Sequence, residues 1–321
     1  MENLTDVTEF ILLGFAVERW LESLLFVAVV ITCFLILMGN MIIIFITLVD
    51  SHLKTPMYFF LRNYSLLEIT YTLVVIPKML SNLLAERKTI SLPGCFIQIF
   101  FFFFLGTNIF FYLSIMCLDR YIAVCNPLRY ATIMNARVCF QLLVGSWAVS
   151  FLLVLPPSVM TAKLKFCGPN IINHFFCDTT PLFQLSCQDT RLVKLVTLFV
   201  AVFTLLSTLA INFASYLQII FTILHIPSAA GQKNTFSTCS AHLIVISVQY
   251  GSCIGRYIRP PENSGEESDK VLALLYTLGI QLFNPFIYTL RNKQVKQALR
   301  NVVQRLSVSS RPQRHLGPLL H

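Results

Sequence analysis

The stretch Ser114–Tyr130 reads Ser-Ile-Met-Cys-Leu-Asp-Arg-Tyr-Ile-Ala-Val-Cys-Asn-Pro-Leu-Arg-Tyr. It ends an apolar run that begins near Cys95, and it places an acid beside a base, Asp119 and Arg120. Pro127 lacks an amide hydrogen and clashes with the preceding turn, so it ends the helix that this run predicts. The stretch therefore predicts a charge pair at the inner mouth of a long apolar helix, just before a basic loop.

Two interpretations of this charge pair are open. In the first, Arg120 is a snorkelling side chain that keeps its stem in the apolar layer and its charge in water. In the second, Asp119 and Arg120 form a switch, and their rearrangement at the membrane boundary opens a docking site.

The composition places the chain in a lipid bilayer. Of its 321 residues, 56% are hydrophobic and 12% are charged, whereas soluble proteins carry about 25% charged residues. Each apolar run is long enough to cross a bilayer as a helix, and the runs cover 24–49, 57–82, 95–121, 139–161, 193–224, 235–258 and 271–290. We predict an all-α membrane protein, a seven-transmembrane helix bundle with a short amphipathic eighth helix. Residues 1–321 are expected to form one domain, with an extracellular N-terminus (1–23), a helical bundle (24–290) and a cytoplasmic tail (291–321).

The basic and acidic residues are unevenly distributed between the two alternating sets of loops. Thirteen of the 24 Lys and Arg residues lie in alternate loops and the tail, and twelve of the 15 Asp and Glu residues lie in the N-terminus and the opposite loops. Because basic loops stay in the cytoplasm, we expect a multi-pass protein of the plasma membrane with its N-terminus outside and its C-terminus inside. The net charge of +9 is then no sign of a nucleic-acid partner. Lys296 and Arg300 alternate with Val295 and Leu299, which predicts a helix lying on the anionic inner leaflet.

Residues near the N-terminus predict one modification. Asn3-Leu4-Thr5 is an N-glycosylation sequon on the predicted outer side, so we expect Asn3 to be glycosylated. No basic segment followed by an apolar core precedes the first span, which is therefore expected to direct membrane insertion itself.

Glu68 is the only acid deep within the predicted spans. A charge in that position is costly and is functional by default. The alternative is a neutral, hydrogen-bonded carboxyl group with a structural role.

Four cysteines lie on the predicted outer side: Cys95, Cys167, Cys177 and Cys187. An oxidising exterior makes them disulfide candidates, and four cysteines allow three pairings. Zinc binding by His174, Cys177 and Asp178 is an alternative by ligand type, but we expect no metal and no cofactor.

One face of the third span has the features of a ligand-binding wall. At helical spacing it carries Phe102, Phe103, Gly106, Thr107 and Phe110. The small Gly106 and the polar Thr107 beneath two phenylalanines leave room for an uncharged ligand. Plain packing between helices is the alternative for each phenylalanine.

Six motifs in order make the chain resemble the odorant receptors, a branch of the rhodopsin-like G protein-coupled receptors. The motifs extend from Gly39-Asn40 to Leu299 and include Leu53–Leu61, Met116–Tyr130, the loop cysteines with His174–Asp178, Lys233–Leu243 and Phe283–Lys293. The chain departs from the family pattern at several positions, such as Gln249 in place of Phe and Gln281 in place of Pro.

The resemblance implies roles for further residues. It pairs Cys95 with Cys177 and Cys167 with Cys187. It places Glu68 where related receptors bind sodium, although Ile109 stands where many odorant receptors have a second acid. The residues implied in G-protein coupling and switching are Asp119, Arg120, Tyr121, Tyr216, His242, Asn284, Pro285 and Tyr288. Arg120 is expected to rest against Asp119 and to swing towards Tyr216 or Tyr288 on activation.

The implied function is that of an odorant receptor and not of an enzyme. Small, mostly apolar volatile molecules would bind in the outer half of the bundle and activate a stimulatory, olfactory-type heterotrimeric G protein that raises cAMP. The predicted ligand-binding residues are Phe102, Phe103, Gly106, Thr107, Phe110, Thr204, Tyr250, Cys253, Ile254, Tyr257 and Thr277, with Thr107 and Tyr257 as leading hydrogen-bond donors. One alternative is a chemoreceptor of the same fold acting outside olfaction. A transporter is disfavoured, because the spans show one deep acid and no internal repeat.

Overall fold

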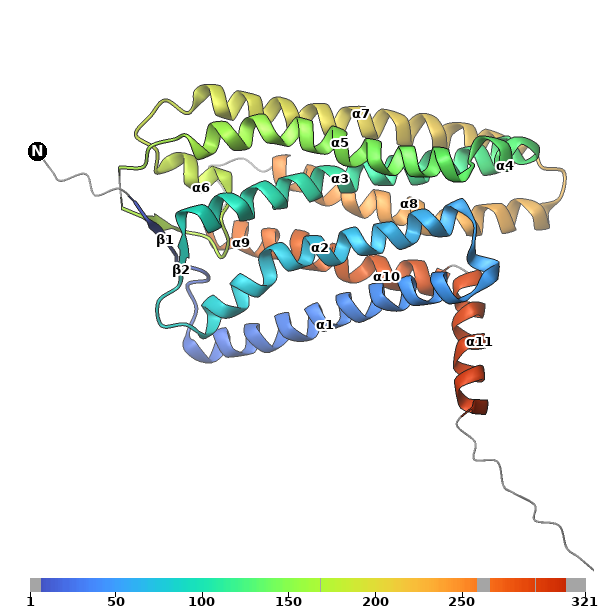
Figure 1. The fold of residues 1–321 in the computed structure, drawn as a ribbon, viewed down its shortest axis with the longest axis horizontal. Coiled ribbons are helices and arrows are strands. Elements are labelled where there is room, and N and C mark those ends of the chain that lie inside the picture. Colours follow the sequence, from blue (N-terminus) through green and yellow to red (C-terminus); the bar gives the residue numbers. More distant parts are fainter. Residues whose placement is uncertain (1–6, 168, 259–265, 292, 310–321) are drawn as a thin grey trace, which may run out of the picture.

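The computed structural model describes residues 7–167, 169–258, 266–291 and 293–309; Asn3 lies outside these ranges. Long helical segments lie side by side as one bundle (Figure 1). They are α1 (Arg19–Val49), α2 (Pro56–Leu84), α3 (Leu92–Cys125), α5 (Ala136–Ala162), α7 (Arg191–Leu224), α8 (Ala229–Ile258) and a seventh segment made of α9 (Glu266–Leu274), the π-helix η3 (Leu275–Gly279) and α10 (Ile280–Arg291). In the described ranges six helical stretches are long and apolar enough to cross a membrane, and α8 contains a shorter apolar stretch. The predicted all-α membrane bundle is confirmed.

A proline or a capping side chain marks the first turn of α2, α3 and α5. Pro56 occupies the first turn of α2, where its missing amide hydrogen has no intrahelical partner to lose. The Ser91 hydroxyl accepts a hydrogen bond from the Gly94 amide at the start of α3, and the Asn135 side chain accepts one from Val138 at the start of α5. These caps satisfy amides that the first helical turns leave unpaired.

Short elements close one end of the bundle. They are α6 (Thr179–Gln184) and the strands β1 (Glu9–Leu12), β2 (Thr89–Ser91) and β3 (Ile171–Ile172), in the sheet order β2-β1-β3. β1 pairs antiparallel with β2 and parallel with β3, and Phe10, Leu12 and Ile172 are buried. The all-helical prediction did not include this sheet, because strands of two to four residues carry too little hydrophobic periodicity. We call this end of the bundle the sheet end.

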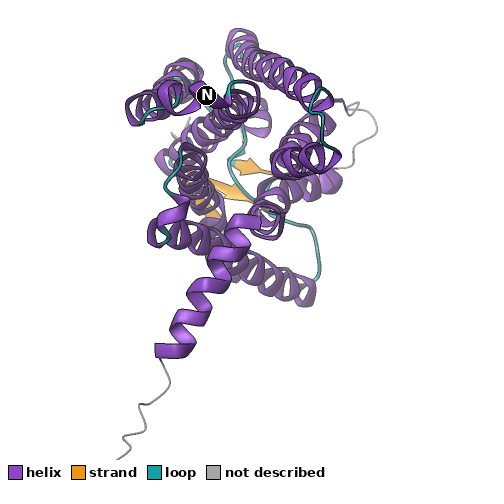
Figure 2. Cartoon of the chain, turned by 90° about the vertical axis from the view of Figure 1, so that its right-hand side faces the viewer, coloured by secondary structure: helices purple, strands orange, loops and turns teal. Residues whose placement is uncertain are grey.

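The opposite end, which we call the tail end, carries η1 (Ser51–Leu53), η2 (Pro127–Arg129), α4 (Tyr130–Ile133) and α11 (Lys293–Ser309). Viewed from the tail end, α11 projects away from the bundle (Figure 2). Val295 and Ala298 are buried against the bundle, and the Tyr58 hydroxyl donates a 2.6 Å hydrogen bond to Gln294 Oε1. α11 occupies the position of the predicted eighth helix.

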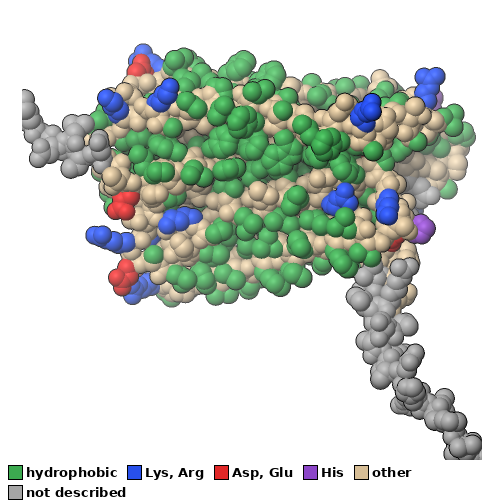
Figure 3. Space-filling model, viewed as in Figure 1, with side chains coloured by type: hydrophobic (Ala, Val, Ile, Leu, Met, Phe, Trp, Pro, Cys, Tyr) green, Lys and Arg blue, Asp and Glu red, His purple; other side chains and the backbone are tan. Residues whose placement is uncertain are grey.

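The surface fits a lipid environment. On the face shown in Figure 3, hydrophobic side chains cover the middle and charged side chains gather towards the two ends. Large apolar side chains on the outward faces of α1 and α7, such as Phe34, Phe45, Phe199 and Phe213, are more than half exposed. A lipid-facing surface needs no polar cover, whereas in water it would be an aggregation-prone patch.

Gly39 allows α1 to approach α10 closely. A Cβ atom at this position would lie 2.9 Å from Cβ and 3.0 Å from Cγ of Pro285. We therefore expect Gly39→Ala to lower the stability of the protein by about 1–3 kcal/mol through overpacking. Gly145→Ala is the matched control, since a Cβ there meets nothing within 4 Å. Thermal unfolding of the two purified variants checks this prediction, and equal midpoints would contradict it.

Candidate functional site

A cavity of about 370 Å³ lies in the half of the bundle nearest the sheet end. α3, α5, α6 and α7 supply most of its wall, and single residues come from α2, α8 and η3. The wall consists of Tyr71, Ile99, Phe102, Phe103, Gly106, Thr107, Phe110, Val154, Pro157, Ser158, Thr161, Asp178, Thr179, Thr180, Phe183, Gln184, Lys194, Thr197, Leu198, Val200, Ala201, Thr204, Leu205, Cys253 and Tyr276.

Aromatic rings shape the apolar part of this cavity. The Phe102 ring lies 5.3 Å from Tyr71 and 5.1 Å from Phe176, measured between ring centroids. Phe110 packs edge-on against Tyr250 of α8 at 5.1 Å. Such offset and edge-on contacts each add about 0.5–1.5 kcal/mol beyond area burial, so the wall is held in place before any ligand binds.

Polar groups gather where α6 and the first turns of α7 meet the cavity. Asp178 is buried, and its Oδ1 accepts a 2.7 Å hydrogen bond from the Thr179 amide. Lys194 is exposed on the outer part of α7. Apart from two tyrosines and a cysteine, Asp178 and Lys194 are the ionisable side chains among the described residues that line the cavity.

The cavity includes seven of the predicted ligand-binding residues: Phe102, Phe103, Gly106, Thr107, Phe110, Thr204 and Cys253. Three others do not line it. Tyr250 packs against Phe110 of the cavity wall but is not itself a lining residue. Ile254 is 43% exposed on the outside of α8, because neighbouring residues of a helix point about 100° apart and Cys253 takes the inward position.

Thr277 is the third predicted residue that does not line the cavity. It is fully buried but outside the cavity wall, whereas the preceding Tyr276 lines the cavity. Both residues belong to the π-helix η3, whose wider turn shifts the face that regular helical spacing predicts. The Tyr257 side chain lies outside the described part of the structure.

Sequence reasoning missed the contributions of α5 and α6. Val154, Pro157, Ser158 and Thr161 line the cavity from α5, and four residues of α6 cover it from the sheet end. The missed residues of α7 had a usable signal, since Lys194, Thr197, Leu198 and Ala201 share the helical face of the predicted Thr204.

At the tail end, Asp119 and Arg120 form an ion pair. The Arg120 guanidinium donates to Asp119 Oδ2 from Nη2 at 2.7 Å and from Nε at 3.3 Å. The Tyr130 hydroxyl of α4 donates a 2.7 Å hydrogen bond to Asp119 Oδ1. Burial, together with the nearby Asp119 carboxylate, raises the pKa of Tyr130, so its phenol remains a proton donor. Asp119 is 1% exposed and the Arg120 side chain 12% exposed, so the ion pair is enclosed, whereas a snorkelling arginine would hold its charge in water.

Within the described residues the hydrogen bonds of the Arg120 side chain all go to Asp119, and the other predicted switch residues have partners elsewhere or none. The Tyr216 hydroxyl lies 3.0 Å from His242 Nδ1 and donates to the Cys239 carbonyl at 3.2 Å. Tyr288 is buried, and within the described ranges its hydroxyl has no hydrogen-bond partner. Tyr121 is half-buried. Arg120 therefore rests on Asp119 in this structure.

Between the cavity and the ion pair lies Glu68, which is 1% exposed. Asn284 Nδ2 donates to Glu68 Oε1 at 2.5 Å and to the Tyr64 hydroxyl at 3.2 Å. Glu68 Oε2 lacks a hydrogen-bond partner among the described residues. These contacts join α2 to α10 beside Pro285, at the depth where the helix lacks one backbone hydrogen bond.

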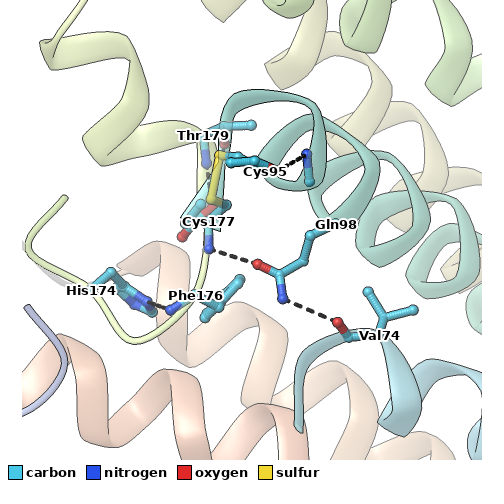
Figure 4. Close-up of a disulfide and its surroundings, with 10 residues drawn as sticks. Val74, Cys95, Gln98, His174, Phe176, Cys177 and Thr179 are labelled. Carbon is cyan, nitrogen blue, oxygen red and sulfur yellow. Dashed lines mark hydrogen bonds between the residues drawn. A yellow bond between two sulfur atoms is a disulfide. The ribbon is translucent and has the colours of Figure 1, made fainter. Parts of the chain in front are cut away.

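Two disulfides hold the sheet end together. They are Cys95–Cys177 and Cys167–Cys187, with Cα–Cα distances of 5.5 and 5.7 Å. Figure 4 shows Gln98 beside the first disulfide: its Oε1 accepts from the Cys177 amide and its Nε2 donates to the Val74 carbonyl, both at 3.0 Å. Because Cys177 is oxidised, it offers no thiolate to zinc, and no group of metal-binding side chains occurs in the described ranges.

The fold and site together define a rhodopsin-like membrane receptor. The structure is similar to the crystal structure of squid rhodopsin, with a TM-score of 0.72 and 16% sequence identity over 91% of this chain and 83% of the rhodopsin chain. A family model described as "Olfactory receptor" matches residues 28–306. Olfactory receptor 6E1 of Mus musculus is 56% identical over 95% of this chain and 98% of its own length, and olfactory receptor 6C76 of Homo sapiens is 49% identical over 96% and 98%. The chain belongs to the olfactory receptor family, whose members are signalling receptors and not enzymes.

Proposed function

We propose that this receptor binds small, mostly apolar volatile molecules in the cavity and activates a stimulatory, olfactory-type G protein that raises cAMP. The observation that carries this proposal is the aromatic cavity near the sheet end, with the Asp119–Arg120 ion pair at the opposite end. The sheet end then faces the exterior and the tail end faces the cytoplasm, as the distribution of basic loops requires. α11 lies on the inner leaflet of the plasma membrane.

The apolar wall limits the affinity. An odorant that buries about 200–250 Å² of apolar surface gains roughly 5–6 kcal/mol at about 25 cal/mol per Å². Losses of translational and rotational freedom reduce this gain. The dissociation constant is therefore micromolar or weaker, since about 8.2 kcal/mol corresponds to 1 μM.

A chain of contacts links the cavity to the tail end. Phe110 of the cavity wall packs on Tyr250, whose hydroxyl donates a 2.6 Å hydrogen bond to Thr208 Oγ1. Asn212 Nδ2 donates to the Tyr250 hydroxyl at 3.1 Å, and Tyr216 follows one turn later on α7. A ligand that displaces Phe110 would disturb this α7–α8 contact, and the G protein would bind the inner ends that separate as a result.

The Gly106→Leu variant tests the position of the ligand. A Cβ atom at Gly106 would lie 3.7 Å from the Tyr71 ring, an ordinary contact, so the backbone accepts a side chain. The remainder of a leucine side chain would fill the cavity. We expect the effective agonist concentration in a cAMP assay with a panel of odorants to rise by about tenfold or more, which corresponds to about 1.4 kcal/mol.

Gly251→Leu is the control for this change, because Gly251 is exposed and a Cβ there meets nothing within 4 Å. Both variants should reach the cell surface in the same amount as the parent. A Gly106→Leu receptor that responds to its best agonist like the parent would place the ligand elsewhere.

A further inference from the structure

The residues that line the cavity differ in how they meet the outer surface of the molecule. Four of the described lining residues are exposed, namely Thr180, Gln184, Lys194 and Leu198, and the others are buried or half-buried. The first three are polar and lie at the sheet end, in α6 and in the first turn of α7. Leu198 is the exception, because it is apolar and 51% exposed.

Leu198 belongs to the apolar stripe that α7 turns towards lipid. Leu195, Leu198, Phe199 and Val202 recur at helical spacing and are all exposed. Of these four residues, Leu198 alone also lines the cavity. The wall between the cavity and the lipid is therefore one side chain thick at this position.

The position of Leu198 along α7 places it within the lipid layer. It lies four residues after Lys194, about 6 Å along the helix axis at 1.5 Å per residue. Lys194 is exposed, and a lysine at the end of a membrane span keeps its ammonium group at the polar boundary of the bilayer. Leu198 then faces the acyl chains just below that boundary.

α5 forms the other side of this thin wall. It runs beside α7 and contacts it (Figure 1), and its residues Pro157 and Ser158 line the cavity. Pro156 and Pro157 are consecutive prolines inside α5, and each lacks the amide hydrogen that a regular helix donates to the preceding turn. Because two backbone hydrogen bonds are already missing, α5 bends at a lower cost beside the cavity than a regular helix does.

A ligand with a mostly apolar surface reaches this wall at high concentration. Moving about 200–250 Å² of apolar surface out of water corresponds to an enrichment of about ten-thousandfold in the bilayer. The route from water, in contrast, passes the polar lining residues of α6 and the strands that close the sheet end. The supply from lipid therefore dominates wherever the wall opens.

We propose that Leu198 is the gate of a lateral portal between α5 and α7, through which apolar ligands pass from the outer leaflet of the bilayer into the cavity. The inference rests on the proposed function in that the cavity is the ligand site, and it adds the route by which that site is filled. A gate is crossed in both directions, so it changes the rates of association and dissociation by the same factor and leaves the dissociation constant unchanged. A residue that only contacts the bound ligand changes mainly the dissociation rate, and with it the dissociation constant.

The test measures both rates with a probe of known chemistry. 1-Aminoanthracene is a small, neutral, fluorescent aromatic molecule, and stopped-flow fluorescence follows its association with the full-length receptor in lipid nanodiscs, with the signal of empty nanodiscs subtracted. Dissociation is followed after mixing with an excess of empty nanodiscs. Leu198→Trp enlarges the gate, and Leu198→Ala removes most of it. Leu195→Trp is the matched control, because Leu195 is 62% exposed on the same stripe and does not line the cavity.

We expect Leu198→Trp to slow association and dissociation by the same factor, about tenfold or more, since a larger side chain must be displaced for the probe to pass. Leu198→Ala should accelerate both rates. The dissociation constant should not change in either variant, and Leu195→Trp should match the parent in both rates.

Equal rates in Leu198→Trp and Leu195→Trp would refute the portal. A changed dissociation constant at an unchanged association rate in the Leu198 variants would refute it as well, because Leu198 would then be a contact residue. The cavity itself is checked separately with Gly106→Leu, which should bind the probe at least about tenfold more weakly. A Gly106→Leu receptor that binds the probe like the parent, or a parent that does not bind it, would overturn the cavity as the site, whatever the Leu198 variants do.

Discussion

Replacing Arg120 with alanine is expected to abolish agonist-stimulated cAMP production while the receptor still reaches the cell surface. In the structure the Arg120 guanidinium is held by Asp119, and Asp119 is held in turn by Tyr130. We propose that activation frees this guanidinium to contact the G protein and Tyr216 or Tyr288. Without the side chain, the docking contact cannot form, whatever the ligand does in the cavity.

The receptor should still reach the surface in measurable amount, because the buried Asp119 carboxylate that loses Arg120 keeps its hydrogen bond from the Tyr130 hydroxyl. Arg129→Ala is the matched control, since Arg129 is an exposed arginine of the adjoining segment η2. Tyr130→Phe, which deletes one of the bonds to Asp119, should raise signalling without agonist. Normal cAMP responses from Arg120→Ala at equal surface expression would refute the switch.

The positions of the long helices could be predicted because hydrophobicity alone determines them. Lipid supplies no hydrogen bonds, so each apolar run must satisfy its backbone internally as a helix. Pro127 then marked where α3 ends. No tertiary information was needed for these features.

The cavity wall was predictable only on the helices with a regular face. α3 presents Phe102, Gly106 and Phe110 at helical spacing, and all three line the cavity. Thr277 lies outside the cavity wall because it belongs to the π-helix η3, a feature that depends on packing and leaves no pattern in the sequence. The α6 residues were not predicted at all for a similar reason, since a six-residue helix is placed over the cavity by the neighbouring disulfides rather than by its own periodicity.

The hydroxyl of Thr204, unpaired among the described residues, shows a further limit of prediction from the sequence. The sequence places Thr197 and Thr204 on one face of the same helix, and nothing in it distinguishes them. Only the side-chain conformation does so, because one hydroxyl turns towards the carbonyl of the preceding turn and the other does not.

Loss of the Cys95–Cys177 disulfide is expected to prevent most of the receptor from reaching the cell surface. This bond joins the start of α3 to the loop that covers the cavity, and it links residues 82 apart in sequence. In the chain-entropy description, such a link stabilises the folded state by about 4.5 kcal/mol, against about 3.3 kcal/mol for the 20-residue link of Cys167–Cys187. The Gln98 bonds that continue from Cys177 to α2 would lose their fixed position as well.

We therefore expect Cys95→Ser and Cys177→Ser to reduce surface delivery severely and to equal degrees, and Cys167→Ser to reduce it less. The double variant Cys95→Ser/Cys177→Ser should resemble either single variant, because one bond is lost in all three. Cys33→Ser is the control, since Cys33 is a free, half-buried cysteine of α1. Surface labelling of intact cells measures the effect, and non-reducing peptide mapping identifies the pairs. A peptide that joins Cys167 to Cys177, or a Cys95→Ser receptor delivered like the Cys33→Ser control, would show that this disulfide does not hold the outer end together.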